Sequence, residues 1–537
     1  MALVVNAATQ DWRLLVEIAL TGKTLRLAEE TTVMDDGTVY DGRLQSVGVI
    51  NQSAGMVQDP KVVAARQSIS IDNSDDQYTT YFDDYTWISR AVTIKAGQGT
   101  TAADYETVHT GRVLVSGGVS FTEQAMVVNI DDDRNKDADV LPPNKFFTST
   151  YPNVEDKSAT QPIPIVYGDW SASQGAERVP AFQIDSTVGT GGKFKWAGHA
   201  VKDLESVWLD DGTGAPTSVA FSAENNGDAT FTLDVAYAPD TDTVTVHGKG
   251  ATDDGTASGT LLTTLPDIVT DILETWLSVP SGNINSAQFT AWKNNLSVAD
   301  EARRWIGADI SSNTLLSEAM VEGFGDLIIK DGKYYPVYRI VPLTNLDVFR
   351  DADVRTDGGG RKVYQVVSDP EQNYLNKVAA DYAYNPATGR YTRFEDSDTA
   401  EITDAGTTER RRVKYNWLYK QVGAESRAER ELYNFSTITE MVSLNLGPRA
   451  LTKEPTDMIR LVYGKYSDEA GTPLQVRKIS KDFKAMAARV TAWNVAALAI
   501  GRWTSDTAPT FAASNDLEKE ENGHWTDAAN AEGSIWF

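Results

Sequence analysis

The side chains that most often perform catalysis or bind metals are few in this chain and lie far apart. Its 537 residues include no cysteine and four histidines, which are His109, His199, His247 and His524. Without cysteine there is no thiolate nucleophile or ligand, and no two histidines have the spacing of a zinc-binding HExxH helix. We therefore expect no catalytic, cofactor-binding or metal-binding residue, and we expect each histidine to lie in a strand or at the surface.

Residues 189–194 (GTGGKF) have the glycine content of a phosphate-binding loop. A Walker loop needs an earlier glycine, separated by four residues from its Gly-Lys pair, and a hydroxyl residue after the lysine. Thr187 and Phe194 occupy those two places. The stretch therefore predicts a hairpin turn and not a nucleotide site.

The stretch of residues 129–143 alternates oxygen-bearing side chains as calcium loops do. The alternating residues are Asp131, Asp133, Asn135, Asp137 and Asp139. An EF-hand loop also supplies a central glycine and a final bidentate glutamate, and their places are taken here by Lys136 and Pro142. The stretch therefore predicts a solvated acidic loop without a bound ion.

The chain has 76 acidic and 49 basic residues, which gives a net charge of −27. A field of this sign argues against general binding of nucleic acid, although an acidic wall suits a conduit through which DNA passes. Solubility alone would account for the charge equally well. No stretch has the length and apolar character of a membrane span, and residues 1–20 lack the regions of a signal peptide, so we expect a soluble protein.

Residues 261–340 predict helices packed on a β-hairpin. Pro266 begins an apolar stripe at helical spacing that consists of Ile268, Val269, Ile272, Leu273 and Trp276. A second stripe, which ends at glycines 323 and 325, consists of Leu315, Leu316, Ala319, Met320 and Phe324. Asp331-Gly332, a strong hairpin signal, then joins two strand candidates at 327–329 and 335–340.

The remainder of the chain is punctuated by turn residues. Residues 1–150 and 341–500 alternate short apolar strands with turns, which predicts a barrel or a sandwich in each. Residues 151–260 predict another β-rich region. Within these regions we expect a strand at 79–82 and an exposed acidic loop at 395–409.

The central stretch resembles a known family. Its order of a helix, then LLSEAMVEGFG, then LIIKDGKYYPV looks like the central module of phage baseplate hub, or tail tip hub, proteins. Three further segments resemble the same family, namely PIPIVYGDW (162–170), AGHAVKDLESVWLDDG (197–212) and LGPRALTKEPTDMIRLVYG (446–464). The family often has Pro-Gly-Asp in the last segment, where this chain has Thr456 in place of the glycine.

The resemblance implies a mainly β, multidomain chain with a smaller α/β part. Two tail-tube-like β-barrels would flank β-rich and helix-plus-hairpin middle domains. The implied parts are a barrel at 1–150, a β-rich domain at 151–260, an α/β module at 261–340, a second barrel at 341–500 and a C-terminal tail at 501–537.

The same resemblance implies a structural protein of the virion and not an enzyme. Three copies would present six barrels to a sixfold tail tube, so the implied assembly is a homotrimeric ring at the tail tip, built in the host cytoplasm. The implied partners are distal-tail or tail-tube ring proteins, the tape measure protein and tail fibre or tip proteins. DNA would only pass through the channel.

Two alternatives stay open at this point. The many carboxylates and the 13 tryptophans would also suit a glycan-degrading tail enzyme with a carboxylate pair in a groove. Another tail component, such as a distal-tail or receptor-binding protein, would have a similar β-rich composition.

The acidic loop gives the first prediction. We expect calcium to leave the melting temperature of the protein unchanged, because residues 129–143 lack the glycine and the glutamate of a tight site. Differential scanning fluorimetry with and without calcium measures this. A large upward shift that disappears in the double variant Asp131→Asn, Asp133→Asn would contradict the prediction.

Overall fold

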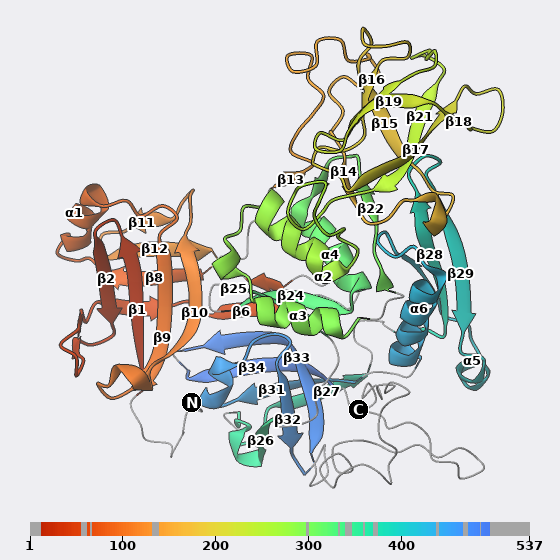
Figure 1. Ribbon diagram of the computed structural model, residues 1–537. Coiled ribbons are helices and arrows are strands. Elements are labelled where there is room, and N and C mark those ends of the chain that lie inside the picture. Colours follow the sequence, from red (N-terminus) through yellow and green to blue (C-terminus); the bar gives the residue numbers. More distant parts are fainter. Residues whose placement is uncertain are drawn as a thin grey trace, which may run out of the picture. The chain divides into compact units, whose positions relative to one another are not determined.

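The computed structural model (Figure 1) is mainly β, with several sheets and a smaller helical part, which confirms the predicted fold class. It describes residues 12–54, 62–64, 67–131, 139–296, 300–330, 333–338, 346–357, 360–368, 374–436, 440–464, 471–483 and 485–494. The chain divides into two compact units, one of residues 1–338 with 374–436 and one of residues 339–373 with 437–537.

An eight-stranded antiparallel sheet forms the N-terminal part of the first unit, with the strand order β2-β1-β9-β10-β12-β8-β5 and β11 paired beside β12. Alternate residues such as Val16, Ile18 and Ile94 are fully buried, as the period of two in a strand requires. The strands are β1 (Trp12–Leu20), β2 (Lys23–Ala28), β5 (Leu44–Val47), β8 (Gln67–Asp72), β9 (Ala91–Gln98), β10 (Glu106–Val113), β11 (Val119–Phe121) and β12 (Ala125–Asp131).

One short segment nearly closes this sheet into a barrel. The backbone N–H of Ala28, in β2, donates to the carbonyl of Asp41 at 2.7 Å, and the N–H of Asp72, in β8, donates to the carbonyl of Arg43 at 2.8 Å. Segment 41–44, which leads into β5, is therefore hydrogen-bonded to β2 at one end of the sheet and to β8 next to the other end. Closing a sheet in this way removes its free edges.

The predicted strand at residues 79–82 is wrong, because these residues lie in helix α1 (Gln77–Asp84). The Asn73 side chain accepts the backbone N–H of Tyr78 at 2.7 Å, which positions the first turn. Tyr78 is then fully buried. A capping contact and one buried ring outweigh the strand propensity of a Thr-Thr-Tyr-Phe run.

A second β region forms a seven-stranded sheet with the order β18-β17-β21-β15-β16-β20-β19. Residues 189–194 lie at the hairpin between β15 and β16, as predicted, with Gly189 at φ 65° and Gly192 at φ 97°. The strands are β15 (Val179–Asp185), β16 (Lys193–Lys195), β17 (Asp203–Asp210), β18 (Thr217–Val219), β19 (Phe221–Asn225), β20 (Thr230–Leu233) and β21 (Thr243–Lys249).

The predicted helices and hairpin of the central module are present. Helix α2 (Leu265–Asp271) starts with Pro266 and continues as one π-helical turn over Ile272–Trp276. Helix α3 (Ser286–Asn294) and helix α4 (Ser312–Glu322), which ends at Gly323, precede the hairpin of β24 (Gly325–Lys330) and β25 (Lys333–Tyr338). The turn residues 331–332 lie outside the described residues.

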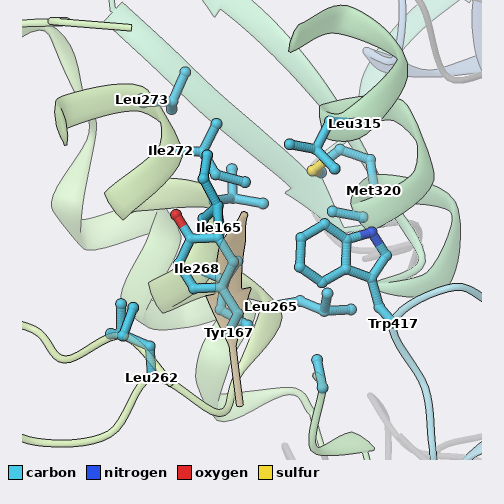
Figure 2. Packing of buried hydrophobic residues seen from close by; sticks show 14 of the residues in the cluster. Ile165, Tyr167, Leu262, Leu265, Ile268, Ile272, Leu273, Leu315, Met320 and Trp417 are labelled. Atoms are coloured by element: carbon cyan, nitrogen blue, oxygen red, sulfur yellow. The ribbon is translucent and has the colours of Figure 1, made fainter. Parts of the chain in front are cut away.

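Figure 2 shows how the stripe of α2 meets side chains from distant parts of the chain. Ile268 and Ile272 lie beside Tyr167 from β14 (Ile165–Tyr167) and Trp417 from beyond residue 374, and all four are fully buried. The central module therefore shares its core with one segment that precedes it in the chain and another that follows it.

Residues 374–436 were predicted to lie within the second barrel, but they belong to the first unit. They form a separate three-stranded sheet of β29 (Arg390–Ser397), β28 (Lys377–Asn385) and β30 (Arg410–Lys414), with helix α6 (Gln421–Phe435) alongside (Figure 1). The exposed loop predicted at 395–409 is also wrong in part. Strand β29 extends to Ser397, and α5 (Thr399–Ala405) follows with the N–H of Ile402 donating to the carbonyl of Asp398.

The second unit contains another sheet, which includes the strand order β26-β32-β33-β34-β31-β27. Its strands are β26 (Asp347–Arg350), β27 (Tyr364–Ser368), β31 (Glu440–Leu446), β32 (Met458–Val462), β33 (Thr472–Asp482) and β34 (Ala487–Asn494). Strand β26 pairs with β32, and a few residues later the N–H of Arg355 donates to the carbonyl of Asn445 in β31. As in the N-terminal sheet, one segment is hydrogen-bonded to two distant strands of the same sheet, here β32 and β31.

Thr456 lies in the turn where the resemblance places a glycine. Its φ is 80°, in the left-handed region, and its backbone N–H donates to the carbonyl of Val476 at 2.7 Å. A β-branched residue is strained in this region, because its Cβ crowds the neighbouring carbonyl. The turn thus keeps a glycine-like backbone although the glycine is missing.

This strain gives the second prediction. Thr456→Gly should be more stable than Thr456→Ala by about 1–2 kcal/mol, because both lose the same hydroxyl and methyl groups and only glycine relieves the left-handed strain. The unfolding free energies of the two variants in urea measure the difference. The usual order, with alanine more stable than glycine, would show that the turn is unstrained.

Candidate functional site

Of the four histidines, the structure buries His109 and His247 and leaves His199 half-buried. His199 Nε2 accepts the backbone N–H of Val166 at 2.9 Å, and its Nδ1 lies 2.8 Å from the carbonyl of Ala200. His247 Nδ1 lies 2.9 Å from the carbonyl of Trp170. His109, in β10, is buried, and His524 lies outside the described residues.

A metal site was not expected. Within the described ranges, no three His, Asp or Glu side chains gather as ligands. Most of the acidic loop, residues 132–138, lies outside those ranges, so its behaviour toward calcium stays a prediction. In the part of the chain that the structure describes, no helix is long and apolar enough to cross a membrane.

One group of polar residues that the fold brings together lies between the central module and residues 374–436. We call this set the polar junction and define it as Arg303, Arg304, Glu318, Glu322 and the backbone of residues 416–418. It lies entirely within the first unit.

Glu322 is the centre of the polar junction. Its side chain is 1% exposed, and its Oε1 accepts the backbone N–H of Asn416 at 2.6 Å. Its Oε2 accepts the N–H groups of Trp417 and Leu418, both at 2.9 Å. A carboxylate at the C-terminus of a helix meets the negative end of the helix dipole, so these three donors are what make its position there tolerable.

Arg303 contacts residues from two parts of the chain, namely residues 170–177 and Tyr419. Its guanidinium carbon lies 4.5 Å from the ring centroid of Trp170 and 4.3 Å from that of Tyr419, within the range of cation–π attraction to both rings. Its Nη2 donates to Glu177 at 2.9 Å. Because Arg303 is 2% exposed, loss of any one partner would leave a buried charge less well compensated.

Arg304 joins helix α4 to the same loop. Its Nη2 lies 3.0 Å from Glu318 Oε2, and its Nη1 donates to the carbonyl of Asn416 at 3.4 Å. Glu318 and Glu322 are one helical turn apart, so one face of α4 presents two carboxylates to the loop at 416–418. The backbone N–H groups of the loop donate hydrogen bonds to Glu322, and Arg304 places a positive charge beside Glu318.

Burial governs the ionisation of these groups. Burial raises the pKa of Glu322 to about 8, and repulsion from Glu318 acts in the same direction, while the three N–H donors oppose the shift. Burial also raises the pKa of Glu318 and lowers that of Arg303. Both oxygens of Glu322 accept hydrogen bonds from the backbone of residues 416–418, so this side chain joins helix α4 to that loop.

Sequence reasoning treated α4 as a purely apolar stripe and missed Glu322. A signal was present, because Leu315, Ala319 and Glu322 stand at i, i+4 and i+7 and so lie on one helix face. A glutamate on a buried face requires partners. Their identity could not be read from the sequence, because residues 416–418 lie about 95 positions away.

Comparison with known proteins gives structural neighbours only. No family model matches the chain, and no curated protein matches it. The chain resembles a chain of the native gene transfer agent virion at 12% identity and a TM-score of 0.44, over 66% of this chain and 89% of that one. It resembles the 43 kDa tail protein of prophage MuSo2 from Shewanella oneidensis at 10% identity and a TM-score of 0.37, over 90% and 98% of the two chains. It resembles a tail protein from Neisseria meningitidis MC58 at 7% identity and a TM-score of 0.39, over 90% and 96%.

The polar junction gives the third prediction. The ordinary pKa of a glutamate is near 4.5 and that of Glu322 is about 8, so between these values the folded protein holds a proton that the unfolded chain has released. The unfolding free energy of the native protein should therefore fall relative to that of Glu322→Gln as the pH rises from about 4.5 to about 8. Urea unfolding at several pH values measures it.

The matched control is Glu429→Gln, which changes an exposed glutamate on α6. It should follow the native protein at every pH, because an exposed carboxylate has little to gain from folding. If the difference between the native protein and Glu322→Gln is constant from pH 5 to pH 8, the carboxylate does not titrate in this range.

Proposed function

We propose that this chain is a structural hub protein of a bacteriophage tail, placed at the tail tip or baseplate. The observation that carries the proposal is that each unit contains one sheet in which a single segment bonds to two distant strands. The helical module lies between these two sheets in the sequence. The four segments that resemble the hub family occur in the family's order around that module.

The resemblance falls on residues that build the fold. Ile165, Tyr167 and Trp170 of the segment PIPIVYGDW are buried, as are Val201 and Val207 of the segment AGHAVKDLESVWLDDG. In the segment at 446–464, the turn at Thr456 keeps a glycine-like φ. The segments that resemble the family thus contribute residues to a core and to a turn. Proteins with a common fold are expected to share residues at such positions.

A hub mechanism would be geometric. Two barrels per chain match a sixfold tube when three chains close into a ring, and closed cyclic symmetry is usual for homo-oligomers. The middle domains would then hold fibres or a plug, and the distal-tail or tube ring and the tape measure protein would contact the barrel side. The net charge of −27 per chain would keep DNA from adhering to the channel wall.

The rival function is a tail enzyme that cleaves glycans. It would need two carboxylates in a groove, one with a raised pKa to act as a general acid. Glu322 has a raised pKa, but its oxygens are occupied by three backbone donors. Glycan hydrolysis that a single carboxylate-to-amide change abolishes would favour this rival.

The fourth prediction concerns assembly. The purified protein, or the particle that contains it, should show a threefold ring, with a mass of three times the 58.6 kDa chain for the free assembly. Analytical ultracentrifugation and single-particle imaging measure these. A stable monomer or a sixfold ring of this chain would refute the stoichiometry, and a channel lined mainly by Lys and Arg would refute the electrostatic part.

A further inference from the structure

Strand β30 is unusually basic for this protein. Its five residues, Arg410–Lys414, read RRRVK and include four cations and no acid, in a chain whose net charge is −27. It is the last strand of the sheet β29-β28-β30, so one of its edges pairs with β28 and the other pairs with no strand among the described residues.

The hydrogen bonds to β28 establish which residues of β30 face outward. The N–H of Lys377 donates to the carbonyl of Glu409 at 3.1 Å, and the N–H of Tyr415 donates to the carbonyl of Asp381 at 2.8 Å. Backbone groups alternate along a strand, so residues 409, 411, 413 and 415 face β28. The N–H and C=O groups of Arg410, Arg412 and Lys414 therefore point away from the sheet.

The side chains of the same three residues share the open face of the sheet. Arg411 lies 5.4 Å from the ring of Phe435 in α6, and Val413 packs on the core beneath that helix. Arg410 and Arg412 point the other way, with side chains 48% and 57% exposed, and Lys414 is exposed as well. The same three residues, Arg410, Arg412 and Lys414, therefore provide both the outward backbone groups and the exposed basic side chains.

The carboxylates on this face do not neutralise it. Asp381 binds both Arg393 and Arg412, at 2.8 and 2.5 Å. Glu395 binds both Lys377 and Arg410. Two carboxylates are therefore shared among four cations, and Lys414 adds a fifth positive charge beside the ring of Tyr391.

We propose that the free edge of β30 is a docking site for an extended segment of a partner protein with carboxylates at alternate positions. The segment adds to the sheet as a fourth strand beside β30. Its backbone bonds to Arg410, Arg412 and Lys414, and its carboxylates lie opposite their side chains, since directly opposed residues in paired strands have Cβ atoms about 5 Å apart.

The observations favour a polypeptide over DNA. A polypeptide strand can pair with both the outward N–H and the outward C=O groups, whereas a phosphate can only accept from the N–H groups. The strong negative charge of the whole chain also repels a nucleic acid. They also favour β30 over the opposite edge strand, because the two arginines of β29 are balanced by Glu395 and Asp396, whereas β30 has four cations and no acid.

The test uses fluorescence anisotropy with a labelled nine-residue peptide that alternates glutamate and threonine. The comparison peptide has the same composition with its glutamates in one block. We expect the alternating peptide to bind roughly tenfold tighter, because only its carboxylates match the strand period. Equal affinity of the two peptides, or equal competition by a DNA duplex, would reduce the site to a general cation patch and overturn the proposal.

Two matched pairs of variants locate the site. Arg412→Pro and Arg412→Gln both remove the guanidinium, but only proline removes the outward N–H, so Arg412→Pro should bind the alternating peptide roughly fivefold more weakly than Arg412→Gln. Lys414→Gln should weaken binding, whereas Arg390→Gln, the same charge change on β29, should not. Unaltered melting temperatures verify that each variant is folded. Equal binding by Arg412→Pro and Arg412→Gln would contradict strand addition.

The chain itself carries carboxylates at alternate positions, at Asp516, Glu518 and Glu520. The assay is therefore repeated with residues 501–537 removed. Unchanged peptide affinity supports an external partner. Peptide binding that is strong only after the removal would identify the chain's own segment as the occupant and overturn the partner assignment.

Discussion

An open β-sheet has two edges with unpaired N–H and C=O groups. The architecture of this protein depends on whether another segment forms hydrogen bonds to those edges or leaves them exposed. In the N-terminal sheet, segment 41–44 bonds to β2 at Ala28 and to β8 at Asp72. In the second unit, the chain from β26 to Arg355 bonds first to β32 and then to β31. The same device, one segment that changes partner, therefore appears in both sheets.

The sheet of residues 374–436 is treated differently. Helix α6 covers one face of this sheet. The edge strand β30 exposes the basic side chains of Arg410, Arg412 and Lys414 on the other face. Charged residues on an edge strand ordinarily prevent unwanted pairing, because like strands repel each other. The same charges would select a strand of opposite charge, so protection against self-association and recognition of an acidic segment have one physical origin.

Buried polar groups supply the second constraint. Glu322 and Arg303 are both almost fully buried, and each has its partners in segments far away in the chain. Buried polar and charged groups contribute little net stability, since desolvation offsets attraction, but they leave very few alternative arrangements in which every such group has its partners. The polar junction therefore holds the three-stranded sheet to the central module in one relative position.

Much of the secondary structure could be predicted from local patterns. The stripe of Ile268, Val269 and Ile272 gave helix α2, and Asp331-Gly332 lay between β24 and β25. These predictions hold because hydrophobic period and turn chemistry are local properties of the chain. The strand expected at residues 79–82 is a helix, because the side chain of Asn73 and the burial of Tyr78 outweigh local propensity.

The sequence by itself determined the β-rich class, the acidic charge and the order of segments that resembles the hub family. Only the tertiary structure decided that residues 374–436 separate from the second sheet, that Glu322 bonds to residues 416–418, and that Arg410, Arg412 and Lys414 turn their backbone groups outward. The physical reason is the same in each case. These features depend on pairings between distant residues, and no local period in the sequence encodes which strand or loop will be the neighbour.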